Sequence, residues 1–95
     1  MIPSGPQFAA RVALYVATNI TGIAPLPRNV RDTGRVRGLA ALMLNDGGMT
    51  WLDIAIHLYG RRVHTTPHKG ADQWRGTVQA EAAIAEFRKL WEVQT

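Results

Sequence analysis

Four segments of the chain repeat apolar residues three and four positions apart, the spacing that places side chains on one face of an α-helix. Glycine or proline lies between successive segments and favours a turn there. Because 46% of the 95 residues are hydrophobic, one core can form, but a second domain is not expected. The sequence therefore predicts one compact all-α domain spanning 1–95, with about five to six helices. The apolar segments are 5–20, 34–45, 50–59 and 77–93, and a more polar helix is expected at 64–74.

Several classes of protein are excluded by what the sequence lacks. The chain has no cysteine, which excludes disulfides, thiolate nucleophiles and cysteine-ligated zinc. No apolar run approaches the roughly 18 to 20 residues that cross a bilayer, and the first residues show no basic leader followed by a hydrophobic stretch. We therefore expect a cytoplasmic protein, in a bacterial cell or a phage-infected host, without a membrane partner.

Local signals place the expected helix ends. Two prolines and two glycines make 21–34 a predicted connector, in which Asp32 or Thr33 caps the next helix. Thr50 and Asp53 form a capping-box pattern at the start of the helix after that.

The segment 50–59 is apolar on two helical faces. It is therefore expected to pack on several sides, with only Asp53 and His57 pointing outward. One face carries Trp51, Ile54, Ala55 and Leu58, and the other carries Leu52, Ile56 and Tyr59.

The last expected helix has an alanine-rich apolar stripe. This stripe serves either the core of the monomer or a homodimer, and Glu92 is placed to pair with Arg88 one turn away. The stripe consists of Ala80, Ala83, Ile84, Phe87, Leu90 and Trp91.

Positive charge is concentrated in two parts of the chain. The net charge is +4, the isoelectric point is near 10.4, and nine of the eleven cations are arginine. Arginine suits phosphates and guanine edges because its planar fork donates two parallel hydrogen bonds. Taken alone, the clusters suit a nucleic-acid partner and a merely solvated basic surface equally well. They consist of Arg28, Arg31, Arg35 and Arg37, and of Arg61, Arg62, Lys69 and Arg75.

The stretch 60–70, GRRVHTTPHKG, is polar and basic although it follows an almost wholly apolar segment. A packed helix, a tight turn containing Gly60 and a second helix with a polar start together describe a helix-turn-helix. In that motif the second helix enters the major groove of DNA by its N-terminus. The second helix is expected to begin near His64, and Trp74 is expected to cover its edge.

Each side chain of this predicted helix start suits a particular contact. His64, Thr65 and Thr66 are placed for base edges, where hydroxyls and imidazole form hydrogen bonds and threonine methyls meet thymine. Arg61 and Arg62, on the turn, are placed for backbone phosphates.

Three motifs resemble the C-terminal DNA-binding domain, domain IV, of the bacterial replication initiator DnaA. They are Arg35-Val36-Arg37, the apolar run 39–44, and YGRRVHTT at 59–66. The resemblance covers nearly the whole chain and implies a Trp-repressor-like helix-turn-helix fold that binds duplex DNA. It also implies that the His-Thr-Thr helix contacts bases in the major groove, that Arg35 enters the adjacent minor groove, and that Arg37 makes a second contact.

The chain departs from that family at four positions. Val63 replaces an aspartate used in base recognition, Pro67 a small aliphatic residue, Arg61 a glycine, and Gly38 a glutamine. The preferred DNA sequence is therefore expected to differ. The chain has no GxxxxGK[ST] loop, so no nucleotide cofactor is expected, and the resemblance implies a DNA-binding domain standing alone.

Two classes of function follow. The first is sequence-preferring binding of duplex DNA, in replication or transcription control, in competition for initiator sites, or in DNA packaging, with a phage or mobile element as one source. The second is a protein-interaction module that keeps the fold without base recognition. No enzyme is expected, because Ser4 is the only serine and fits a helix cap; no metal is expected, because HTTPH at 64–68 lacks a third ligand. The residues expected at DNA are Arg28, Arg31, Arg35, Arg37, Arg61, Arg62, His64, Thr65, Thr66, His68 and Lys69.

Overall fold

The computed structural model describes residues 5–22, 30–60, 62 and 65–94. These residues form helices joined by turns, and no strand occurs among them, which confirms the predicted all-α class. The elements are α1 (Gly5–Thr21), α2 (Val30–Asp46), α3 (Trp51–Ile54), the π-helical turn η1 (Ala55–Tyr59), α4 (Thr65–Asp72) and α5 (Val78–Gln94).

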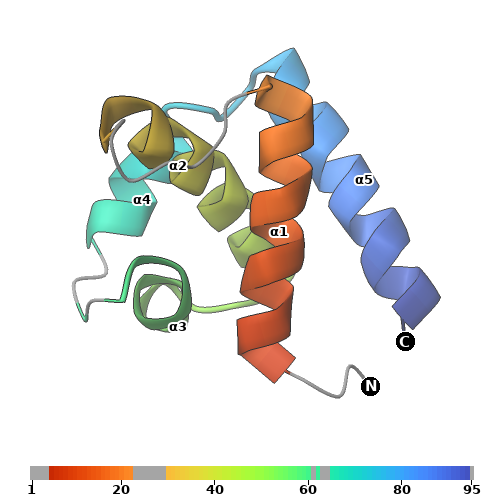
Figure 1. Cartoon of the computed structure of the whole chain (residues 1–95), viewed down its shortest axis with the longest axis horizontal. Coiled ribbons are helices and arrows are strands. Elements are labelled where there is room, and N and C mark those ends of the chain that lie inside the picture. Colours follow the sequence, from red (N-terminus) through yellow and green to blue (C-terminus); the bar gives the residue numbers. More distant parts are fainter. Residues whose placement is uncertain (1–4, 23–29, 61, 63–64, 95) are drawn as a thin grey trace.

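The helices surround α2, which contacts every other element (Figure 1). Helices α1 and α5 lie side by side and run in opposite directions, so the start of α1 and the end of α5 lie at the same end of the molecule. Helix α4 packs chiefly on α2, at the side away from α5, and α3 continues through η1 toward α4. Every residue from 38 to 44 is buried, as expected for a helix covered on all sides.

The central helix is α2, whereas the sequence indicated that 50–59 would be the helix packed on several sides. Leu52 keeps 46% of its surface exposed, so the second apolar face of that segment is only partly covered. Ile54 and Ala55 are buried, and Asp53 is exposed as expected. Apolar periodicity identifies the faces that are able to pack, but the neighbouring helices decide which of them are covered.

Helix α2 begins four residues earlier than predicted, at Val30. Asp32 and Thr33 therefore lie inside the helix and do not cap it. The prolines lie before the helix, and Gly34 costs a helix only about 1 kcal/mol, which packing of α2 offsets. The prediction of a connector reaching to residue 34 was wrong for this reason.

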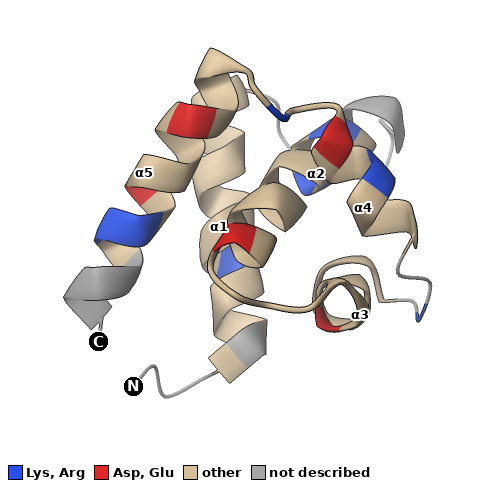
Figure 2. Ribbon diagram, turned by 180° about the vertical axis from the view of Figure 1, so that it is seen from behind, with Lys and Arg blue, Asp and Glu red and all other residues tan. Residues whose placement is uncertain are grey.

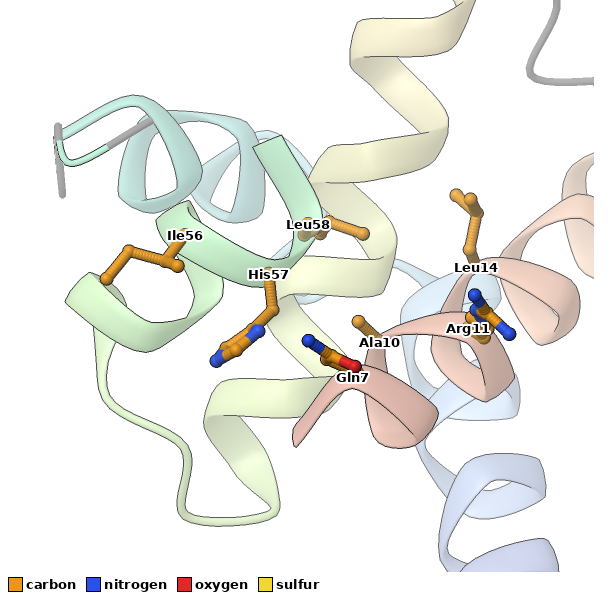
Figure 3. Close-up of a pocket in the computed structure, with 7 residues that line it drawn as sticks. All are labelled: Gln7, Ala10, Arg11, Leu14, Ile56, His57 and Leu58. Carbon is orange, nitrogen blue, oxygen red and sulfur yellow. The ribbon is translucent and has the colours of Figure 1, made fainter. Parts of the chain in front are cut away.

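The helix that begins at Trp51 is capped as predicted, because the Thr50 hydroxyl accepts a hydrogen bond from the Asp53 amide at 3.2 Å. It widens into η1 and ends at Gly60, whose φ of 71° favours glycine. His57 was expected to point outward but is half-buried. It lines a hollow between α1 and η1 together with Gln7 and Arg11 (Figure 3).

Helix α5 buries Ala80, Ala83 and Phe87, as its apolar stripe predicted. Arg88 binds Asp46, at the end of α2, through two hydrogen bonds of 3.0 Å. This contact between helices was not predicted from the sequence. The side chains of Trp91 and Glu92 lie outside the described residues.

Candidate nucleic-acid interface

Helices α2 and α4 cross with their backbones in contact. A methyl group added at Gly38 would lie 2.5 Å from the carbonyl oxygen of Gly70, and one added at Gly70 would lie 3.0 Å from the Cα of Gly38. Real side chains do not approach a backbone so closely, so this crossing requires glycine, at Gly38 above all. It brings one edge of α4 alongside the first turns of α2.

Trp74 ties the end of α4 to the same part of α2. Its ring is buried, with 5% of its surface exposed, and its indole Nε1 donates a hydrogen bond of 2.8 Å to the backbone carbonyl of Arg35. The guanidinium of Arg35 lies over the indole ring, 5.6 Å from its centre, in a cation–π contact. Trp74 was expected to cover the edge of the polar helix, but it is a core residue that holds Arg35.

Tyr59 supports the crossing from the side of η1. A methyl group at Gly70 would lie 3.1 Å from its hydroxyl. Burial raises the pKa of the Tyr59 phenol from 10.0 to about 12, against the opposing effect of Arg37. The guanidinium of Arg37 lies 5.9 Å from the centre of the Tyr59 ring, so this cation is partly engaged within the protein.

An open groove of about 540 Å³ follows the crossing. Three of the predicted DNA-binding residues, Arg35, Thr66 and Lys69, come together along it, and all three are exposed. The sequence placed Arg35 in one cluster and Lys69 in the other, and the packing of α4 on α2 joins the two clusters. The complete lining is Gly34, Arg35, Tyr59, Thr66, Lys69, Gly70 and Gln73.

The first turn of α4 has an exposed side and a buried side. Thr65 and Thr66 are exposed, whereas Pro67 is fully buried. Proline is tolerated in a first helical turn because the amide it lacks would have no helical partner there. Pro67 therefore anchors the helix start and leaves both threonine hydroxyls at the surface.

His68 lies on the side of α4 that faces α3. Its ring meets the Trp51 ring edge-on, with 4.9 Å between centres, and its Nδ1 lies 3.3 Å from the Asp72 carboxylate. Asp72 also binds Arg75 at 2.6 Å, and Arg75 lies over Trp51. His68 was predicted to contact DNA. In the structure its ring contacts α3 and its own helix, although half of its side chain remains exposed.

The remaining predicted residues are only partly described. Arg62, in the connection before α4, is exposed. Arg28, Arg61 and His64 lie outside the described residues, as does the side chain of Arg31. Figure 2 shows lysine and arginine at the start of α2, on α4 and in the connections on both sides of α4, with acidic residues at the ends of both helices and on α5.

Two residues that build this groove were not identified as functional from the sequence, Gly38 and Gly70. A signal was present, because each glycine interrupts a predicted helix at a cost of about 1 kcal/mol relative to alanine. A glycine inside a helix often marks a close approach of two backbones. What the sequence alone does not give is that the two glycines meet each other.

Comparisons with known proteins do not assign the chain to a family. No protein-family model, curated protein or solved structure matches it. Within the described residues, no helix is both long and apolar enough to span a membrane. The same residues contain no group of three or more histidine, aspartate or glutamate side chains placed to hold a metal ion.

Proposed function

We propose that this chain binds duplex DNA with a preference for particular sequences, using α3 with η1 and α4 as a helix-turn-helix. The observation that carries the proposal is the groove between α2 and α4, which is lined by exposed Arg35, Thr66 and Lys69. Cations provide affinity for the phosphate backbone, and hydroxyls beside them provide hydrogen bonds to base edges.

The first turn of α4 suits the major groove. Thr65 and Thr66 are exposed, and helix starts carry amide groups that have no helical partner and attract phosphate. Pro67 is the residue of this turn that is buried against the protein. We assign both threonines to base contacts and the exposed Arg62, in the connection before α4, to the backbone.

Arg35 is held in a defined position, which favours a specific contact over a diffuse one. Its backbone carbonyl is bonded to Trp74 and its guanidinium lies over the same ring. A side chain ordered before binding loses less conformational entropy on binding. In the initiator family that the sequence resembles, the corresponding arginine enters the minor groove, and we assign Arg35 this role. The same resemblance makes control of replication or transcription the process we propose.

The proposal is tested by selecting preferred sequences from a random duplex library and measuring affinities at several salt concentrations. Lys69→Ala should weaken binding to all duplexes and reduce the slope of log K against log salt by about 0.9 for each phosphate that the variant no longer neutralises. Arg35→Ala should weaken binding to all duplexes and also reduce the preference for the selected duplex, because Arg35 is assigned a specific contact in the minor groove. Thr65→Ala should mainly reduce the preference for the selected duplex, by about 1 to 3 kcal/mol per base contact.

Arg88→Ala is the matched control, because Arg88 lies on α5 and binds Asp46. It removes the same charge from another part of the molecule and should leave the salt slope close to that of the unmodified chain. If Arg35→Ala and Arg88→Ala weaken binding equally, the groove is not the interface. If the unmodified chain binds no duplex, the alternative, a protein-interaction module, takes its place.

A further inference from the structure

The groove has a fixed width, because two contacts hold its sides together. The first is the crossing of Gly38 and Gly70, where a methyl group on Gly38 would lie 2.5 Å from the Gly70 oxygen and 2.7 Å from the Gly70 carbonyl carbon. The second is the hydrogen bond from the Trp74 indole to the Arg35 carbonyl. Both join α4, or the turn that follows it, directly to α2.

These two contacts lie next to the residues assigned to DNA. Gly38 comes one helical turn after Arg35, and Gly70 lies beside Lys69 and one turn after Thr66. Any change in the separation of the two backbones therefore moves Arg35 relative to Thr66 and Lys69. The contacts of α4 with α3 are less extensive than those with α2, so α2 is the main support of α4.

We infer that Gly38 and Trp74 are positioning residues that fix the distance between Arg35 and the edge of α4, and that this distance sets the preferred DNA sequence. The inference rests on the proposed function. Base contacts require placement within about 0.5 Å, whereas contacts with phosphates tolerate larger shifts because the charge attraction is long-ranged. Moving the two helices apart should thus reduce sequence preference more than general affinity.

Gly38→Ala tests this inference, because its methyl group forces α4 away from α2 while every charged group stays in the chain. We expect the ratio of affinities for the selected and the random duplex to fall about 5- to 150-fold, equivalent to the removal of one base contact. The salt slope should stay unchanged. Trp74→Phe, which removes the indole donor and keeps an aromatic ring, should lower the ratio in the same direction by a smaller factor.

Ala83→Gly is the control for a loss of stability by itself. Ala83 is fully buried in α5, which has no extensive contact with α4. Thermal unfolding of each variant identifies a temperature at which all are folded, and binding is measured there. If Gly38→Ala unfolds the chain, Gly70→Ala replaces it, because its methyl group would lie 3.0 Å from the nearest backbone atom and needs a smaller shift.

The outcomes separate the inference from the proposed function. A fall in the ratio for Gly38→Ala with an unchanged ratio for Ala83→Gly supports the positioning role. An unchanged ratio for Gly38→Ala, or an equal fall for both variants, overturns the positioning role while DNA binding by the unmodified chain stands. Absence of duplex binding by the unmodified chain overturns the proposed function and the inference together.

Discussion

Two helix contacts in this protein use small residues in opposite ways. Where α4 crosses α2, glycines bring the backbones together and leave no room for a methyl group. On the other side of α2, α1 and α5 present alanines whose methyl groups form part of the core. The fully buried alanines there are Ala13, Ala17 and Ala83.

The difference between alanine and glycine indicates that the two sides of α2 contribute differently to stability. Alanine is the best helix former and its methyl group fills space, so the α1–α5 side contributes stability. A glycine inside a helix lowers the stability of that helix. Both glycines of the α2–α4 crossing lie beside a groove that is lined with exposed cations. Closer approach at the expense of stability is the pattern expected for a site, in contrast to a purely structural contact.

The largest expected effect on the free energy of unfolding comes from placing alanine where the structure has glycine, and glycine where it has alanine. Gly38→Ala should lower the free energy of unfolding by about 1 to 2 kcal/mol, because overpacking outweighs the gain in helix propensity. Ala13→Gly should lower it by about 1.5 to 2 kcal/mol, through reduced propensity and the removal of a buried methyl group. Urea denaturation measures both values. A stabilising effect of Gly38→Ala would mean that the helices do not touch at this point.

A smaller effect is expected from Tyr59 at high pH. The folded protein holds the phenol proton up to about pH 12, whereas an unfolded tyrosine releases it near pH 10.0. The stabilising contribution is therefore complete below pH 10 and is lost as the pH rises toward 12.

Comparing the unfolding free energies of the unmodified chain and Tyr59→Phe across this range isolates the effect, because other alkaline titrations cancel in the difference. The unmodified chain should lose more stability than the variant as the pH rises. Parallel curves would show that the α2–α4 crossing leaves the Tyr59 hydroxyl in water.

The smallest effect is expected at Gly34, one turn before Gly38 on the same helix. A methyl group there would meet no atom within 4 Å. Gly34→Ala should therefore raise the free energy of unfolding by about 0.5 to 1 kcal/mol, the normal gain in helix propensity. Opposite signs for Gly34→Ala and Gly38→Ala, measured by the same denaturation experiment, would locate the close approach at Gly38 alone.

Much of the local structure could be predicted from the sequence. The cap at Thr50, the end of η1 at Gly60 and the buried stripe of α5 each depend on residues within a few positions of one another. The start of α2 could not be predicted, because Gly34 weakens a helix only slightly and tertiary packing outweighs it. Residues of both basic clusters were predicted at one DNA interface, but the groove formed where α4 crosses α2 at Gly38 and Gly70 was not predicted.

Sequence patterns were enough to predict the helices of the described residues, most of their positions, and the segment with polar and basic side chains at a helix start. The central place of α2, the meeting of Gly38 with Gly70 and the binding of Arg88 to Asp46 became visible only in the folded structure. Helix periodicity and capping depend on residues within one or two turns of one another and can therefore be predicted from short stretches of sequence. The crossing of two helices depends on the fit of surfaces that lie far apart in the chain, and only folding brings those surfaces together.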